Sequence, residues 1–368
     1  MNEIAVRTHQ GEYYAGDTVY GMIYLKVVTA DFSDKIQLQI SGIEQCDYTP
    51  VDGDDWSINH SNDCLRNPYT DKVMANPVEV LALKEPLPVG NYKFPFHYKL
   101  KPNLPSTTSI SSPRGNWHGS VIYRVTALAS NKLSDTQTFV CLGKRTNNAV
   151  KVAYLDEKII KTCFCYDRGG LSLMAELDKL AYTIGETIQL SVNVNNKSSE
   201  LAKSVKCWLK RTVWMYGCWM NKELAKEDPQ SSLIYATYRG ADRVRLQDEV
   251  SIDAEEIGFK NLGSVKPKEN CEWTCSIHLS DSDGVLLPPS TTGNYLRVAY
   301  FIQVHVSVPR ASDLIVTVPV SHVLPSRNSE WLEWRPEKWM ENCQMLQRHD
   351  KLAVSRSILE SPVYEGLL

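Results

Sequence analysis

The side chains of this sequence that could act in catalysis do not occur at the spacings that known catalytic motifs require. The chain has no Gly-x-Ser-x-Gly nucleophile turn, no His-Glu-x-x-His helix, no Gly-x-Gly-x-x-Gly turn and no phosphate-binding Gly-Lys-Ser/Thr loop. His97 and His305 alternate with apolar residues, which indicates strand side chains that point to solvent. We therefore expect a protein that catalyses no reaction.

Ten cysteines are the remaining candidates for metal or thiol chemistry. Cys163 and Cys165 are separated by one residue, and Cys271 is separated from Cys275 by three. Neither pair joins a second pair at the spacing of a zinc finger. We expect free thiols and no metal or other cofactor, because structural disulfides rarely persist in a reducing compartment. A metal- or thiol-dependent enzyme is kept as a hypothesis from a different functional class.

Length and charge narrow the class of protein. A chain of 368 residues exceeds the size at which one hydrophobic core keeps growing, so we expect two domains. The formal net charge of −3 creates no overall field that would attract nucleic acid. The first residues have no apolar core of signal-peptide length, and no run of about 18 apolar residues occurs anywhere. We expect a cytosolic protein that does not bind nucleic acid.

The elements that must position any binding site are predicted to be β-strands. Apolar and polar residues alternate along 302–308 and 314–318, as in half-buried strands, and glycine, proline and asparagine or aspartate interrupt this pattern at short intervals. Long segments with helical periodicity are missing. The pattern predicts an all-β fold built from antiparallel sandwiches.

An internal repeat predicts that there are two such sandwiches. Gly16-Asp17-Thr18-Val19 and Gly185-Glu186-Thr187-Ile188 both open strands. Later in each half, a Leu-Pro motif at Leu104-Pro105 or Leu287-Pro288 leads through Gly-Asn into another strand. Two matches in the same order rarely arise by chance. We predict an N-terminal sandwich at 1–166, a C-terminal sandwich at 167–326 and a tail at 327–368.

Two stretches, 46–77 and 221–256, interrupt the predicted strands. The first is rich in Asp, Asn and Gly, and the second is rich in charged residues. Long loops in compact domains are either binding loops or insertions. Solvated connectors are an equally good interpretation of both stretches.

The motifs together resemble the arrestin fold, and in detail the α-arrestins, or arrestin-domain-containing proteins. The resemblance spans about residues 10–325, and His118-Gly119-Ser120 falls on a strand-entry motif of the family, so we interpret it as structural. The matching motifs include Tyr14 to Gly21, Leu87 to Phe96, Leu104-Pro105-Ser106, His118 to Tyr123, Cys163-Phe164-Cys165, Gly170 to Leu173, Leu177-Asp178-Lys179, Tyr182 to Glu186, Asn195 to Ser199 and Val318-Pro319-Val320.

The resemblance implies two immunoglobulin-like sandwiches, side by side, and an adaptor function. Such proteins link the cytoplasmic regions of membrane receptors or transporters to the endocytic, sorting or ubiquitin-ligase machinery. It implies a cytoplasmic protein that is recruited peripherally to the plasma membrane or endosomes. The alternative is a stable coat-type sorting scaffold that resembles the arrestin-like subunit of retromer.

The end of the chain holds weak candidates for protein binding. The Pro-Pro-x-Tyr motif by which α-arrestins bind WW domains is missing, which puts recruitment of a ubiquitin ligase in doubt. Ser361-Pro362-Val363-Tyr364 keeps only the second proline and the tyrosine. The segment from Tyr364 to Leu367 fits the tyrosine-x-x-apolar pattern of endocytic sorting signals. An ordinary disordered chain end explains the same residues.

The tail before this end is predicted to dock. Trp339, Cys343 and Leu346 fall on one face of a helix that Pro336 could open. We expect this face to pack on the C-terminal sandwich; the alternative is an apolar face offered to a partner or a membrane surface.

A basic patch is the last candidate, and it would bind phosphoinositides or phosphopeptides. The first strand has no paired lysines of the kind that sense receptor phosphates in classical arrestins, so that role is not carried over to Ile4–His9. Charges along strands and loops are more commonly solvated. The members of the predicted patch are Lys206, Lys210, Arg211, Arg239, Arg243 and Arg245.

Overall fold

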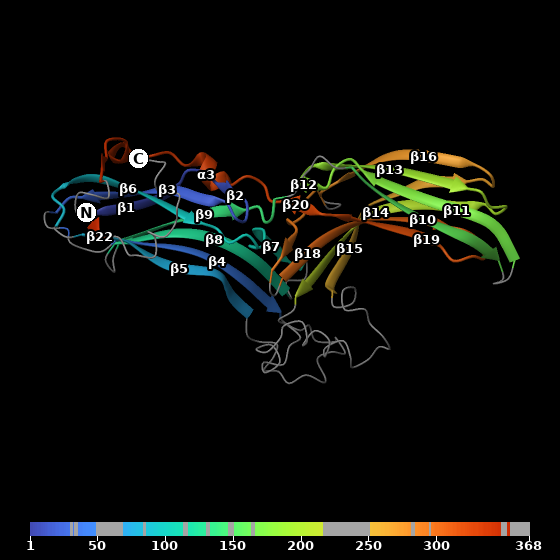
Figure 1. The fold of residues 1–368 in the computed structure, drawn as a ribbon, viewed down its shortest axis with the longest axis horizontal. Helices are drawn as coiled ribbons and strands as arrows, with labels where there is room; N and C mark the ends of the chain where they lie inside the picture. Colours follow the sequence, from blue (N-terminus) through green and yellow to red (C-terminus); the bar gives the residue numbers. More distant parts are fainter. Residues whose placement is uncertain are drawn as a thin grey trace, which may run out of the picture.

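The structure is a computed structural model of the chain, in which two β-sandwiches lie end to end along the long axis (Figure 1). The prediction of an all-β fold with two sandwiches and a partly helical tail is confirmed. The described residues are 1–29, 32, 36–48, 69–83, 86–112, 117–129, 133–145, 151–162, 166–215, 251–280, 284–293, 296–346 and 352–353.

The N-terminal sandwich consists of two facing sheets. The first has the order β1 (Glu3–Thr8), β3 (Thr18–Val27), β6 (Gly90–Lys99) and β21 (Gln344–Met345). The second has the order β2 (Glu12–Tyr13), β9 (Leu133–Cys141), β8 (Trp117–Ala129), β4 (Ile36–Tyr48), β5 (Tyr69–Leu83) and β22 (Leu352–Ala353), with β7 (Thr108–Ser111) also paired to β8.

The C-terminal sandwich repeats this plan. One sheet has the order β10 (Val152–Thr162), β11 (Tyr166–Leu177), β13 (Thr187–Asn196) and β16 (Asn270–His278). The other has the order β15 (Ser251–Val265), β14 (Ala202–Met215), β18 (Leu296–Ser307) and β17 (Thr291–Thr292), with β19 (Leu314–Val320) paired to β18. The short strands β12 (Ala181–Thr183) and β20 (His322–Leu324) pair in parallel.

Strict alternation of apolar residues along the strands forms the two cores. In β3 every second residue from Val19 to Val27 is buried, and in β18 every second residue from Leu296 to Val306 is buried. Each fully buried aliphatic side chain stabilises the fold by about 1.5–3 kcal/mol relative to an exposed one. The alternation therefore determines which face of each strand turns inward.

The predicted internal repeat is present as matching turns. Gly16 and Gly185 adopt positive φ values of 88° and 80°. In the first turn the Asp17 carboxylate accepts a hydrogen bond from the backbone N–H of Tyr14 at 2.9 Å. In the second, Glu186 accepts one from the N–H of Thr183 at 3.0 Å. The glycine and the acid three residues after the donor thus have the same roles in both halves.

The predicted division of the chain at residue 166 separates two strands that pair with each other. β10 lies within the range predicted for the N-terminal sandwich, yet it pairs along its length with β11 of the C-terminal sandwich. The division at 166 stays a prediction. Strand pairing favours a boundary before Val152.

Strands also occupy the ends of the two predicted interruptions. β4 extends to Tyr48, β5 begins at Tyr69 and β15 begins at Ser251. The ends of both stretches therefore continue the sheets. The prediction that the strand pattern is broken there was wrong for these residues. The central parts, 49–68 and 216–250, lie outside the described residues.

The tail crosses to the N-terminal sandwich, where α3 (Ser329–Glu333) lies over β2 and β9 (Figure 1). α4 (Lys338–Glu341) and β21 follow, and β21 pairs in parallel with β6. The expectation that the tail packs on the C-terminal sandwich was therefore wrong, and the predicted helical face is limited to one turn. None of the helices in the described part of the chain is long and apolar enough to span a bilayer.

We predict that Gly16→Ala destabilises the N-terminal sandwich. An added Cβ would lie 3.6 Å from Pro102, an ordinary contact, so the cost comes from the positive φ and is about 1–2 kcal/mol. Gly170→Ala is the control, because nothing lies within 4 Å of its added Cβ and its φ is not positive. Thermal denaturation measures both, and equal midpoints for the two variants would contradict the prediction.

Candidate functional site

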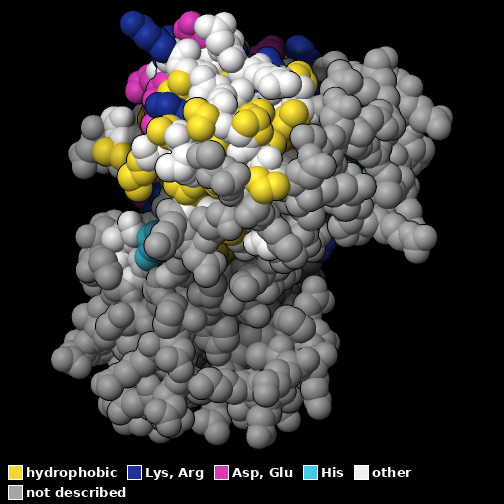
Figure 2. Space-filling view, turned by 90° about the vertical axis from the view of Figure 1, so that its left-hand side faces the viewer, with side chains coloured by type: hydrophobic (Ala, Val, Ile, Leu, Met, Phe, Trp, Pro, Cys, Tyr) yellow, Lys and Arg dark blue, Asp and Glu magenta, His cyan; other side chains and the backbone are white. Residues whose placement is uncertain are grey.

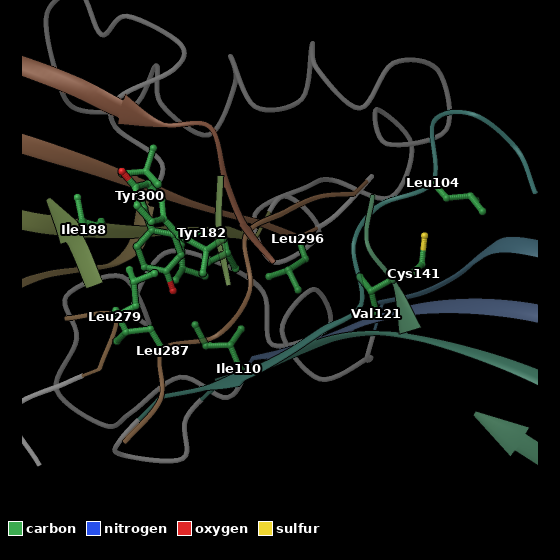
Figure 3. Close-up of a cluster of buried hydrophobic side chains, with 14 of the residues drawn as sticks. Leu104, Ile110, Val121, Cys141, Tyr182, Ile188, Leu279, Leu287, Leu296 and Tyr300 are labelled. Atoms are coloured by element: carbon green, nitrogen blue, oxygen red, sulfur yellow. The ribbon is translucent and has the colours of Figure 1, made fainter. Parts of the chain in front are cut away.

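Apolar side chains from both sandwiches meet in a seam between them. Figure 3 shows Leu104, Ile110 and Val121 of the N-terminal sandwich in one cluster with Leu287 and Leu296 of the C-terminal sandwich. Each of these side chains is buried. The two domains are therefore joined by a continuous apolar contact as well as by the chain.

Two of the hydrogen bonds that cross the seam are counterparts of each other in the internal repeat. Thr108 donates its hydroxyl to the carbonyl of Pro289 at 3.1 Å. Thr291 donates to the carbonyl of Ser106 at 2.9 Å. The two Leu-Pro motifs, at residues 104 and 287, thus contact each other reciprocally, as the two copies of a surface do in an isologous dimer.

A tyrosine holds each Leu-Pro motif in place from within its own sandwich. The Tyr123 hydroxyl donates to the carbonyl of Pro105 at 2.8 Å, and the Tyr300 hydroxyl donates to that of Pro288 at 2.6 Å. Burial raises the pKa of both hydroxyls far above the ordinary value for tyrosine, so both remain protonated donors. The motifs at the seam are thereby fixed to the two cores.

Glu44 is a fully buried carboxylate at the seam. Its Oε1 atom accepts a hydrogen bond from the backbone N–H of Leu296, across the domain boundary, at 2.6 Å. A Cβ added to Gly293 would lie only 2.2 Å from this oxygen. Glycine at 293 therefore provides the space that the carboxylate occupies.

The tail contacts the N-terminal sandwich through α3. Trp331 donates its ring N–H to the carbonyl of Thr8 at 3.0 Å, and a Cβ on Gly11 would lie 3.0 Å from the ring. Asn328 caps the helix and donates to the carbonyl of Thr138 at 2.9 Å. Glu330 accepts from the Thr138 hydroxyl at 2.8 Å. Together these bonds connect α3 to both sheets of the sandwich.

Two further tryptophans of the tail stack with cations of the first sheet. The Arg7 guanidinium lies 4.8 Å from the ring centre of Trp334, and the Lys26 ammonium lies 5.9 Å from that of Trp339. Met340 is buried, and the N–H of Leu346 donates to the carbonyl of Lys93 at 3.2 Å. On the described part of the face in Figure 2, apolar side chains lie among basic and acidic ones.

The outer edge of β1 is covered by side chains of β9. The N–H of Val6 donates to Asp135 at 2.8 Å, and the N–H of Thr8 donates to Gln137 at 2.8 Å. Arg7 forms an ion pair with the same Asp135 at 2.6 Å. These donors are satisfied within the sandwich, so an added strand would have to displace Asp135 and Gln137.

The structure separates the described members of the predicted basic patch. Lys206 and Lys210 are half-buried on β14, whereas Arg211 is buried and pairs with Glu255 at 2.8 Å. Arg211 therefore lies apart from the surface that the lysines could offer. Arg239, Arg243 and Arg245 lie outside the described residues, so the patch stays a prediction.

Aromatic rings surround Lys206. Its ammonium lies 5.8 Å from the ring centre of Phe259, which is 55% exposed. Trp208 stacks on Phe259 at 6.2 Å and contacts the His305 ring at 4.4 Å. Burial lowers the pKa of His305, which makes the neutral ring the favoured form. His305 thus packs against Trp208 and is half-buried, whereas the sequence predicted a side chain that points to solvent.

The remaining sequence candidates lie at the end of the chain and in β8. Ser361, Pro362, Tyr364 and Leu367 lie outside the described residues. His118 lies in β8, and its Nε2 atom is 3.4 Å from the hydroxyl of Ser109. Among the residues that the structure describes, no three His, Cys, Asp or Glu side chains gather to hold a metal ion.

Comparison with known families matches both sandwiches in tandem. The model of the arrestin (or S-antigen) N-terminal domain matches residues 3–143, and that of the C-terminal domain matches residues 167–321. The chain belongs to the arrestin family. The predicted fold and family are therefore confirmed, and membership of this family supports the predicted adaptor function in general terms.

Curated relatives match this chain over part of their own length. Arrestin domain-containing protein A of Dictyostelium discoideum is 20% identical over 88% of this chain and 51% of its own length. Phosrestin-1 of Drosophila melanogaster is 26% identical over 61% of this chain and 63% of its own. Human arrestin domain-containing protein 5 is 23% identical over 52% of this chain and 56% of its own length. The chain thus spans half to two thirds of these relatives.

We predict that Gly293→Ala loosens the seam through its contact with Glu44. The added methyl group overlaps the carboxylate, and the expected cost is about 1–3 kcal/mol of unfolding free energy. In a Glu44→Ala background the overlap is absent, so the same substitution should cost less, with a coupling of about 0.5–3 kcal/mol. Denaturation of the four proteins of this cycle measures the coupling. Additive costs would show that Gly293 acts independently of Glu44.

We predict that Trp331→Ala releases α3 from the N-terminal sandwich. The variant loses the bond to Thr8 and the ring contact at Gly11, so amide hydrogens of residues 329–341 should exchange about tenfold faster. Leu332→Ala is the matched control, because this neighbouring side chain is 46% exposed. Equal exchange rates in the two variants would mean that Trp331 does not hold the tail.

Proposed function

We propose that this arrestin-family protein is an adaptor that links membrane receptors or transporters to endocytic, sorting or ubiquitin-ligase machinery. The observation that supports this most is the seam, where reciprocal bonds between Thr108, Pro289, Thr291 and Ser106 join both matched domains into one binding platform. An adaptor needs such a platform, because it has to present separate surfaces to two partners at once. Catalysis is not part of the proposal.

The proposed partners are the cytoplasmic regions of membrane proteins, which the adaptor would meet at the plasma membrane or on endosomes. Lys206 with Phe259 offers a cation beside an exposed aromatic ring, a combination suited to acidic peptides or anionic headgroups. Arg239, Arg243 and Arg245 complete the proposed patch from the sequence. Nucleic acid is not a proposed partner, given the net charge of −3.

The end of the chain is the proposed contact with sorting machinery. Ser361, Pro362 and Tyr364 form an incomplete WW-domain ligand, and Tyr364 with Leu367 forms a tyrosine-based sorting pattern. Because the first proline of the WW ligand is missing, we propose the sorting pattern as the main use of Tyr364. A ubiquitin ligase would then be reached through another partner.

Proximity labelling in cells tests the proposal. The chain should label membrane cargo and endocytic proteins, and Lys206→Ala with Lys210→Ala should reduce cargo labelling several-fold. Lys203→Ala, an exposed charge on the same strand, is the control and should leave labelling unchanged. A neighbourhood of soluble metabolic proteins alone would contradict the adaptor function. A stoichiometric complex in native mass measurements would indicate the coat-type scaffold instead.

A further inference from the structure

Two cysteine thiols touch each other inside the C-terminal sandwich. Cys207 of β14 and Cys275 of β16 belong to opposite sheets, and their Sγ atoms are 3.5 Å apart. A disulfide has an S–S distance of about 2.05 Å, so the sulfur atoms would have to approach by about 1.5 Å. Rotation of the side chains and small shifts of the sheets can supply a movement of this size.

The strand registers make the contact a defined feature of the fold. Cys207 lies opposite Val304 in β18, and Cys275 lies opposite Leu190 in β13. Val304 and Leu190 are both fully buried, so both cysteines are on the inner faces of their sheets. The two thiols therefore face each other across the core.

A small oxidant has a route to this pair. Cys207 is fully buried, but Cys275 is partly exposed, since it lies on an edge strand of its sheet. β15 is the edge strand of the opposite sheet, and it lies close to β16: a Cβ on Gly258 would be 3.0 Å from Ile277. The pair thus lies near the side of the sandwich where these two edge strands approach each other.

We infer that Cys207 and Cys275 form an oxidation site, where a peroxide converts the two thiols into a disulfide that joins the two sheets. The inference stands apart from the proposed adaptor function, because it rests only on the geometry of the C-terminal sandwich. Intracellular disulfides of this kind are transient and respond to oxidants, so the reduced pair is the resting state.

The chemistry divides the two thiols into an attacking and a resolving sulfur. Either thiol can donate the hydrogen bond between them, but only Cys275 is partly exposed, so a peroxide reaches Cys275 first. The contact with Cys207 and the nearby Lys260 ammonium lower the pKa of Cys275, which favours its thiolate. The Cys275 thiolate attacks hydrogen peroxide, forming a sulfenic acid and releasing one water after protonation. The Cys207 sulfur then attacks this sulfur, the S–O bond breaks and a second water leaves. Two thiols lose two electrons and two protons, and the peroxide becomes two waters.

The disulfide would change the stability of the sandwich. It closes a loop between residues 68 apart in sequence, which lowers the entropy of the unfolded chain. The expected result is an unfolding midpoint that is about 5–10 °C higher in the oxidised protein. A reducing thiol should reverse the shift. Oxidation would therefore make the sandwich more stable without changing its topology.

Peroxide treatment of the full chain tests the inference. After exposure to hydrogen peroxide, the protein is alkylated, digested and analysed by mass spectrometry. The expected product is a peptide pair that joins Cys207 to Cys275, with both thiols protected from alkylation. Protection should disappear after treatment with a reducing thiol. Alkylation of both cysteines at the same rate with and without peroxide would overturn the inference.

Two cysteine variants provide a second test of the inference, through the shift of the unfolding midpoint. Cys275→Ala removes the partly exposed partner, so peroxide should no longer shift the unfolding midpoint. Cys271→Ala is the matched control, because Cys271 is also a partly exposed thiol of β16, and the shift should persist there. Loss of the shift in Cys271→Ala with retention in Cys275→Ala would overturn the assignment. Wild-type peptide mapping decides the question if both variants unfold.

Discussion

The exchange of hydroxyl and carbonyl bonds between the two Leu-Pro motifs is the contact on which the arrangement of the domains depends. Thr108 and Thr291 each satisfy a carbonyl of the opposite sandwich in a buried seam, where an unpaired carbonyl would cost about 1–3 kcal/mol. The hydroxyls of Tyr123 and Tyr300 bind the same motifs by hydrogen bonds from within each sandwich. The orientation of the sandwiches is thus tied to the two cores, and a change in either core reaches the seam.

Glu44 breaks the symmetry of this seam. It comes from the N-terminal sandwich alone and bonds the backbone of Leu296, where Gly293 makes room for it. Burying a carboxylate is costly unless it is hydrogen-bonded, so the bond from the N–H of Leu296 offsets part of this cost at the seam. The carboxylate therefore links the N-terminal sandwich to the backbone at the start of β18.

The tail contacts one sandwich, and the sulfur pair lies in the other. Trp331 and Trp334 bind the N-terminal sandwich through Thr8 and Arg7, next to the edge of β1 that Asp135 and Gln137 cover. The thiols lie within the other sandwich. An oxidant that joins the sheets would therefore act on a different domain from the one that the tail contacts.

The sequence by itself determined the strands, their inward faces and the duplication, because alternation and turn glycines act locally: Gly16 and Gly185 need the same φ wherever the turns lie. Only the tertiary structure decided that α3 crosses to the N-terminal sandwich, that Arg211 is buried beside Glu255 and that Cys207 meets Cys275. These contacts join residues far apart in the chain, and no local pattern of residues specifies which distant surfaces will meet.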